Sequence, residues 1–269
     1  MRRIALLLSL LLAACTEAPP PAALGPAKYE PSEVGIVILH GRLGMPSYLQ
    51  RLAADLRGLG YRVLTPEMSW SRQRAWDRDV AGSLDEIDAA LARLRADGAK
   101  LTVLAGHSLG GAMTACHTAQ RPPADAVLLM AAAWNPSGGY WQAVVGQSVG
   151  RAAEAVAAGK GAERANYTYL ADGGGPLGVI ATAIGFHDFN RPDSPINLPD
   201  CVANWKKPLA NLWIAASGES QMAAQVKRQS LRLAPPHPLG RFETLTGSHI
   251  GVVQVALPTV TAWLDRVRR

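Results

Sequence analysis

The sequence predicts an α/β protein in which a mostly parallel sheet of about six strands is covered by helices on both faces. Three observations lead to this prediction. Short apolar runs alternate with longer segments of helical periodicity. The connections between them are short, as in sheets whose parallel strands are joined by crossover helices. The chain has 269 residues, 48% of them hydrophobic, which suits one large domain, expected over residues 34–269.

The expected strands are short runs rich in branched apolar residues. The run at 34–39 is apolar throughout, which is typical of a strand buried on both faces of its sheet. The remaining five strands are expected at 61–64, 101–105, 126–130, 209–215 and 241–245.

Helices are expected between these strands. In residues 77–96 the apolar positions recur at steps of four and three, which predicts one buried helical stripe made of Val80, Leu84, Ile87, Leu91 and Leu94. Pro258 opens a closing helix, because proline is favoured in a first helical turn. The other helices are expected at 46–57, 109–118 and 222–233.

Residues 131–208 interrupt the strand–helix alternation. A helix is expected at 140–158, a glycine-rich turn at 173–175, and a loop rich in Pro, Asn and Asp at 186–195. Long excursions from a compact domain are usually lids or binding loops. We therefore interpret residues 135–207 as a cap insertion, whose aromatic residues, together with the loop 68–76, are candidates for lining an apolar pocket.

Residues 1–14 have the pattern of a secretion signal, because two arginines precede an apolar stretch too short to span a bilayer stably. The segment Leu12-Ala13-Ala14-Cys15 resembles a bacterial lipobox, although an ordinary signal peptide with an incidental cysteine is the alternative. The resemblance implies lipidation of Cys15 and a protein anchored in the cell envelope on the periplasmic face, with Thr16 favouring the outer membrane. Residues 15–33, rich in Pro and Ala, are expected to be a tether.

Charge and cysteine usage exclude some classes of partner. The net charge is +6 but the basic residues are dispersed, so no nucleic acid partner is expected. No Cys or His spacing indicates a metal site, and no cofactor is expected. Cys116 and Cys201 could form a disulfide in an oxidising compartment, but a buried free thiol at Cys116 is equally compatible with the sequence.

The segment 101–111 reads as a strand, a G-x-S-x-G turn and a helix. Gly106 and Gly110 are needed because side chains there would collide with the neighbouring strand and helix. Such a turn exposes the Ser108 hydroxyl and points the N-terminus of the following helix at a reacting carbonyl group. The motif alone is weak, but its position after the third of the expected strands indicates a nucleophile.

Gly106-His107-Ser108-Leu109-Gly110-Gly111 resembles the nucleophile elbow of α/β hydrolases, and the similarity extends from about residue 34 to the C-terminus. The resemblance implies the α/β-hydrolase fold in a minimal version, because the segment before residue 34 leaves no room for the family's first two strands. It also implies an oxyanion hole formed by two backbone N–H groups, those of Leu109 and of Arg42, which follows His40-Gly41 after the first strand.

The family order of nucleophile, acid and base implies the other catalytic residues. His249 is the one histidine that follows the last expected strand, and it is the expected base. The family pattern I-x-G-x-x-D corresponds to residues 214–219, which places Glu219 at the acid position and alanine where the glycine is usual. A solvated glutamate at a helix start is the alternative for Glu219, with Asp188 and Asp193 as other candidates for the acid.

The expected function is a lipid-anchored serine hydrolase of carboxylic esters or thioesters that works through an acyl-enzyme on Ser108. Its partners would be a small acyl ester or thioester substrate and the membrane. Two alternatives stay open: a non-catalytic envelope lipoprotein that retains a hydrolase fold, and an acyltransferase with the same catalytic residues.

Overall fold

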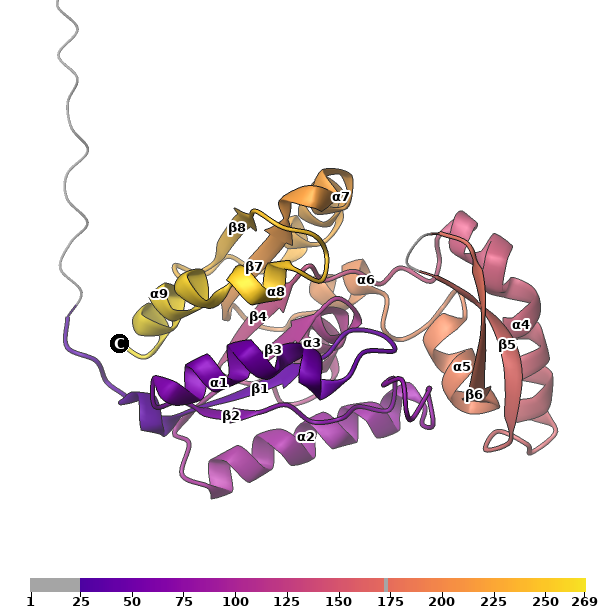
Figure 1. Ribbon diagram of the computed structural model, residues 1–269, viewed down its shortest axis with the longest axis horizontal. Helices are drawn as coiled ribbons and strands as arrows, with labels where there is room; N and C mark the ends of the chain where they lie inside the picture. Colours follow the sequence, from indigo (N-terminus) through magenta and orange to yellow (C-terminus); the bar gives the residue numbers. More distant parts are fainter. Residues whose placement is uncertain (1–24, 172–173) are drawn as a thin grey trace, which may run out of the picture.

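The computed structural model describes residues 25–171 and 174–269, which follow the expected alternation of strands and helices (Figure 1). The expected signal segment, Cys15, the first part of the expected tether and residue 173 of the glycine-rich turn lie outside the described residues. The backbone N–H groups of Lys28 and Tyr29 donate to the carbonyl oxygen of Arg268 at 2.9 and 3.0 Å. The N-terminal described segment is therefore attached to the C-terminal end of the domain.

The central sheet has six parallel strands in the order β2-β1-β3-β4-β7-β8, which confirms the expected fold class. The sheet strands are β1 (Val34–Leu39), β2 (Arg62–Leu64), β3 (Leu101–His107), β4 (Ala126–Met130), β7 (Ala210–Ala216) and β8 (Arg241–Leu245). All residues of β1, β3, β4 and β7 are buried, since helices cover both faces. In a parallel sheet the carboxyl ends of the strands share one edge, so the segments that follow them meet there.

Two layers of helices cover the sheet. One face carries α1 (Gln50–Gly58), α8 (Val252–Val255) and α9 (Leu257–Val267), and the other carries α2 (Val80–Ala96) and α3 (Leu109–Gln120). The predicted apolar stripe of α2 is buried against the sheet. The expected helix at 46–57 begins with the short turn η2 (Pro46–Leu49), and the one at 222–233 is divided into α7 (Ser220–Gln229) and η4 (Leu231–Leu233). Within the described ranges, no helix has the length and apolarity needed to cross a membrane.

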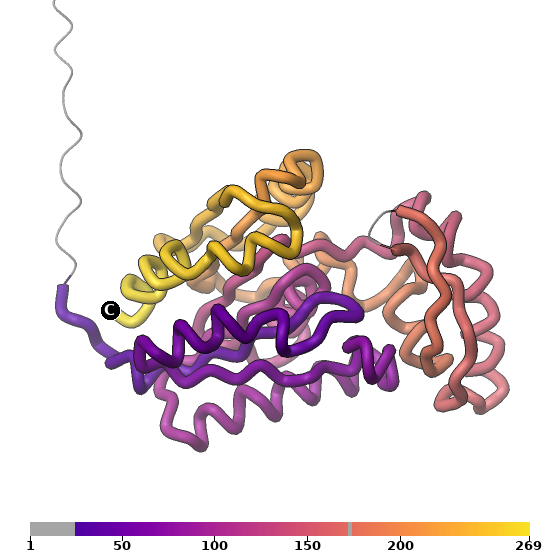
Figure 2. The backbone as a smooth tube through the Cα atoms, in the orientation of Figure 1, coloured from indigo at the N-terminus to yellow at the C-terminus, as the bar shows by residue number. Residues whose placement is uncertain are grey.

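The chain leaves the sheet after β4 and returns at β7 (Figure 2). This insertion contains α4 (Gly139–Ala157), the antiparallel hairpin of β5 (Arg164–Leu170) and β6 (Pro176–Thr182), α5 (Ala183–Asn190) and α6 (Leu198–Ala203). In Figure 1, α4, α5 and the hairpin stand beyond one end of the sheet, and α6 lies between them and the sheet.

Two features of the insertion differ from the sequence prediction. The hairpin was not expected. The prediction of a loop at 186–195 is wrong for residues 186–190, which belong to α5. The Thr182 side chain caps this helix by accepting a hydrogen bond from the backbone N–H of Gly185. Phe186 and Phe189 are fully buried, so packing stabilises a helix in a segment whose composition is typical of a loop.

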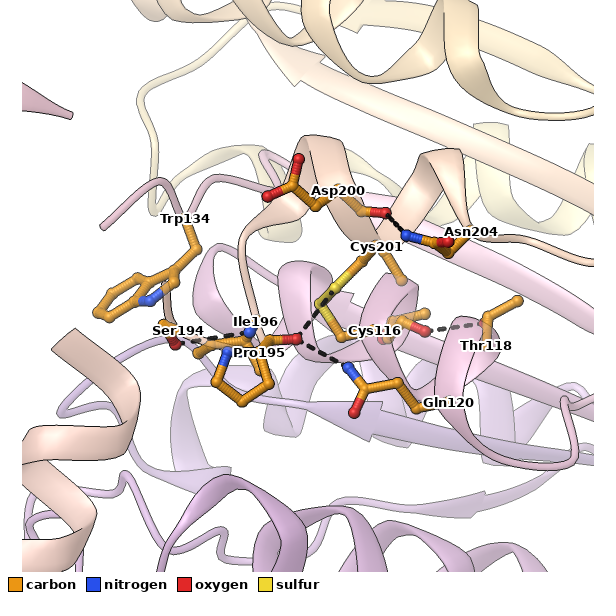
Figure 3. Close-up of a disulfide and its surroundings, with 12 residues drawn as sticks. Cys116, Thr118, Gln120, Trp134, Ser194, Pro195, Ile196, Asp200, Cys201 and Asn204 are labelled. Carbon is orange, nitrogen blue, oxygen red and sulfur yellow. Dashed lines mark hydrogen bonds between the residues drawn. A yellow bond between two sulfur atoms is a disulfide. The ribbon is translucent and has the colours of Figure 1, made fainter. Parts of the chain in front are cut away.

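The two cysteines that the sequence left undecided form a disulfide (Figure 3). Cys116 lies in α3 and Cys201 in α6, and their Cα atoms are 4.7 Å apart. Close to this bond, the side chain of Gln120 donates to the carbonyl oxygen of Pro195 at 2.7 Å. Both contacts attach the returning end of the insertion to α3.

Candidate active site

Ser108 stands on a sharp turn between β3 and α3. Its backbone has a φ of 55° and a ψ of −119°, a strained conformation that persists only where the surroundings impose it. A Cβ on Gly106 would lie 2.1 Å from the carbonyl oxygen of Gly110, and a Cβ on Gly110 would lie 2.5 Å from that of Leu39. The turn therefore requires both glycines, as the motif predicts.

Two short hydrogen bonds link the three expected catalytic side chains. The Nε2 atom of His249 is 2.8 Å from the Ser108 hydroxyl oxygen, and its Nδ1 atom is 2.8 Å from the Glu219 carboxylate. Because a carboxylate only accepts, Nδ1 carries the hydrogen and Nε2 of the neutral ring accepts from the hydroxyl. The structure thus brings Ser108, His249 and Glu219 into one hydrogen-bonded series.

The loops that carry the acid and the base are bonded to one another. Glu219 ends the turn η3 (Ser217–Glu219) after β7, and His249 follows β8. The N–H of Gly218 donates to the carbonyl oxygen of Gly247 at 2.9 Å, and the N–H of Gly247 donates to the Ser217 hydroxyl at 3.2 Å. These bonds fix the separation of the two loops independently of the Glu219 and His249 side chains.

The other candidate acids are bonded elsewhere. Asp188 accepts from the N–H of Val80 at the start of α2 and pairs with Arg191, and Asp193 pairs with the same arginine. Both residues therefore support the insertion, and the structure places neither of them beside His249.

The backbone that follows β1 lies against the nucleophile. A Cβ on Gly41 would lie 3.2 Å from that of Ser108. The His40 ring fixes this backbone, because its Nδ1–H donates to the carbonyl oxygen of Gly41 at 2.8 Å and its Nε2 accepts from the N–H of Met68 at 3.1 Å. Burial lowers the pKa of His40 below its ordinary value of 6.5, which favours this neutral form. Of the two expected oxyanion residues, Leu109 directly follows Ser108 in the chain. Arg42 comes close to Ser108 in space, because it follows Gly41.

Two cavities meet at the nucleophile. The larger has a volume of about 430 Å³ and extends beneath α7 and the insertion. Its apolar walls include Trp134, Trp141, Leu170, Leu198, Met222, Val226 and Ile250. The smaller, of about 210 Å³, lies along the loop 40–44 and is also lined by Tyr48, Leu49 and Val253. Ser108, His249 and Arg42 border both.

The expectation for the aromatic residues is correct for part of the set. Trp134 and Trp141 line the larger cavity, and their rings are 4.8 Å apart. The other aromatic residues of the insertion pack inside it or lie at its surface, and Met68, Trp70 and Trp76 of the loop 68–76 are fully buried. The Arg42 side chain donates to the Tyr169 hydroxyl at 2.8 Å, so it connects the loop after β1 to the insertion.

Sequence reasoning missed the roles of two histidines at this site. His40 supports the backbone after β1, and His107 bonds the loop that carries His249, with its Nε2 atom 2.7 Å from the carbonyl oxygen of that residue. Both lie inside motifs that the sequence identifies, but the contacts of His40 with Met68 and of His107 with His249 join residues far apart along the chain. The one signal for His107 is its position directly before the nucleophile.

Known proteins support the same fold. The structure is similar to that of the alpha/beta hydrolase GrgF from Penicillium sp. sh18, with 13% identity, coverage of 87% of this chain and 90% of that one, and a TM-score of 0.65. It is also similar to a monoacylglycerol lipase from Paleococcus ferrophilus, with 16% identity, coverage of 87% and 94%, and a TM-score of 0.59. The thioesterase domain from the curacin biosynthetic pathway matches with 14% identity, coverage of 87% and 92%, and a TM-score of 0.56.

At these identities the three structures show a shared fold and no more. No curated protein matches the sequence. A family model, that of the alpha/beta hydrolase family, matches residues 36–262, which include all six strands of the central sheet except the first two residues of β1. The chain therefore belongs to the alpha/beta hydrolase family.

Proposed function

We propose that the chain is a serine hydrolase that cleaves carboxylic esters or thioesters through an acyl-enzyme on Ser108. The observation that carries the proposal is the hydrogen-bonded series from Ser108 through His249 to Glu219, with 2.8 Å at each step. A hydroxyl is a weak nucleophile unless a positioned base accepts its proton. The bond to Ser108 supports His249 as that base, and the bond to His249 supports Glu219 as the group that orients the imidazole and stabilises its cation.

In the first half of the reaction, the Ser108 oxygen attacks the substrate carbonyl carbon while its proton passes to Nε2 of His249. The tetrahedral intermediate then collapses, and the same nitrogen returns the proton to the departing alcohol oxygen or thiol sulfur. In the second half, His249 takes a proton from water, whose oxygen attacks the acyl carbon. Collapse releases the acid and restores the Ser108 hydroxyl.

The oxygen of the tetrahedral intermediate carries a negative charge that needs fixed donors. We assign this role to the backbone N–H groups of Leu109 and Arg42. Leu109 begins α3, where the free N–H groups and the positive end of the helix dipole favour an anion. Removing one such donor typically costs about 10²- to 10³-fold in kcat.

The cavities at Ser108 support an ester or thioester substrate with an apolar part. Most of the wall of the larger cavity is apolar, with residues such as Trp134 and Leu198, and Asn135 and Gln225 add polar groups. Its volume lies in the range of small-molecule sites. A second cavity, which Ser108 also borders, leaves space for the remaining half of an ester. The names of the similar structures, a monoacylglycerol lipase and a thioesterase domain, agree with this class of substrate.

The test is hydrolysis of p-nitrophenyl esters of graded acyl length by residues 16–269. Ser108→Ala and His249→Ala are expected to lower kcat by at least about 10⁴-fold. Ser47→Ala is the matched control, because this serine is exposed in η2, and it should retain wild-type turnover. Equal turnover by all four proteins would reject the proposal.

The same proposal includes export and lipid anchoring at Cys15. The disulfide between Cys116 and Cys201 supports export, because such bonds persist in oxidising compartments. Several acyl chains on one cysteine would anchor the protein stably, whereas a single chain would not. A Cys15→Ser protein is expected to lose incorporation of labelled palmitate and to leave the membrane fraction. Unchanged fractionation and labelling would argue against the anchor.

A further inference from the structure

His107 contacts the backbone of the residue that the proposed function makes the base. It is the last residue of β3, where it pairs with Met130 of β4, and it is 8% exposed. Its Nε2 atom is 2.7 Å from the backbone carbonyl oxygen of His249, and the two rings are 4.9 Å apart. Because a carbonyl oxygen only accepts, Nε2 of His107 carries the hydrogen.

The loop that carries His249 needs such support. Its neighbours Ser248 and Ile250 are exposed, Ile250 by 59%. On one side of His249, Gly247 is hydrogen-bonded to the loop that carries Glu219. The carbonyl oxygen of Ser248 accepts a hydrogen bond from the N–H of Val252 at 3.0 Å. At the centre of the loop, the bond from His107 attaches the His249 backbone directly to a buried strand of the sheet.

The bond from His107 to the His249 backbone matters most at the acyl-enzyme stage of the proposed reaction. Once Ser108 is acylated, its oxygen has no hydrogen to donate, so Nε2 of His249 loses that partner. The side chain then keeps the bond to Glu219, whose side chain is 21% exposed. A bond from the sheet to the His249 backbone would hold the imidazole in place while it activates water.

We propose that His107 is a positioning residue that keeps His249 aligned through the acyl-enzyme stage. This inference rests on the proposed function, because it concerns the same reaction. It assigns a task to the first variable residue of the G-x-S-x-G motif, which borders the smaller cavity but takes no part in the proton transfer between Ser108 and His249. Misplacing a catalytic group by about 1 Å can cost about 10²-fold in rate, so a single bond to its backbone matters.

The test compares two substitutions. His107→Phe keeps an aromatic ring against His249 but removes the donor, and it is expected to lower kcat about tenfold with KM within about twofold of wild type. His107→Gln places an amide N–H near the position of the lost Nε2–H, and it should recover most of kcat. His237→Phe is the control, because His237 precedes β8 and His249 follows it, and it should behave as wild type.

Thermal unfolding of each variant separates positioning from a structural role. If His107 only stabilised the fold, both variants would lose melting temperature and active fraction, with normal kcat per labelled active site. Wild-type kcat in His107→Phe, or an equal loss of kcat in the Phe and Gln variants, would overturn the positioning role while leaving the proposed function intact. A wild-type protein that neither hydrolyses esters nor reacts with a fluorophosphonate would overturn the proposed function, and the role of His107 with it.

Discussion

The disulfide between α3 and α6 has a stabilising effect that can be calculated from the chain. Cys116 and Cys201 are 85 residues apart. In the chain-entropy relation, a cross-link that closes a loop of this length lowers the entropy of the unfolded chain by an amount worth about 4.6 kcal/mol at 25 °C. Both residues are buried, at 0% and 4% exposure. We therefore expect the Cys116→Ala/Cys201→Ala protein to lose about 4–5 kcal/mol of unfolding free energy.

Urea denaturation followed by circular dichroism measures this loss. The slope of unfolding free energy against urea should also rise in the double variant, because its unfolded chain is less compact than the cross-linked one. Wild-type protein unfolded in the presence of a reductant is the matched control, since it loses the bond without losing side-chain volume. Unfolding free energies of the oxidised and double-variant proteins that agree within about 1 kcal/mol would refute the loop-entropy reasoning.

The same variant tests how the insertion shapes the substrate site. The helix α6 contributes Leu198 and Pro199 to the wall of the larger cavity, whereas Ser108 and His249 are positioned by the sheet and its loops. Loss of the disulfide is therefore expected to raise KM while kcat stays near the wild-type value. A fall in kcat with unchanged KM would contradict the idea that α6 shapes substrate binding while the sheet and its loops position the catalytic residues.

Two substitutions and one pH dependence give further tests. Gly110→Ala places a Cβ 2.5 Å from a backbone carbonyl oxygen and is expected to cost about 1–3 kcal/mol of unfolding free energy together with most of the activity. The control Gly150→Ala, in an open position of α4, should stabilise the protein by up to about 1 kcal/mol. Equal stability of the two variants would contradict the steric requirement for glycine at position 110. Glu219→Gln is expected to lower kcat by roughly 10³- to 10⁴-fold, because an amide no longer holds the imidazole as a carboxylate does; undiminished kcat would place the acid elsewhere. Burial lowers the pKa values of His40 and His117 below 6.5, so the unfolded chain binds protons at a higher pH than the folded one. The unfolding free energy should then be fully developed above pH 6.5 and fall below it, by at most about 1.4 kcal/mol per pH unit for each ring; a flat dependence in urea denaturation between pH 7.5 and 5.5 would be inconsistent with these shifts.

The sheet could be predicted because each of its strands has a recognisable pattern in its own short stretch of sequence. A continuous apolar run such as Val34–Leu39 is typical of a strand buried on both faces, and the glycines around Ser108 mark a turn that few other residues permit. The insertion gave weaker signals. In β5 only Tyr167 and Tyr169 show the alternation of a half-buried strand, and the partner strand β6 begins with a proline, which disfavours a strand prediction.

The candidate site was predictable where order along the chain determines position in space. Residues that follow parallel strands meet at the same edge of the sheet. The family resemblance, with its order of nucleophile, acid and base, then indicated Ser108, Glu219 and His249 among them. The disulfide could not be decided in this way, because a separation of 85 residues carries no information on the distance between two Cα atoms. The role of His107 likewise depends on a contact across 142 positions of the sequence, which no local pattern encodes.

A fluorophosphonate probe measures whether Ser108 is a nucleophile activated by His249, as we propose. Such a probe forms a covalent bond with an activated serine oxygen, and mass spectrometry then locates the adduct. We predict one adduct per chain, on Ser108, which is absent from Ser108→Ala and forms far more slowly in His249→Ala. A wild-type protein that stays unmodified, or an adduct of equal yield on another residue when Ser108 is replaced, would show that Ser108 is not the activated nucleophile.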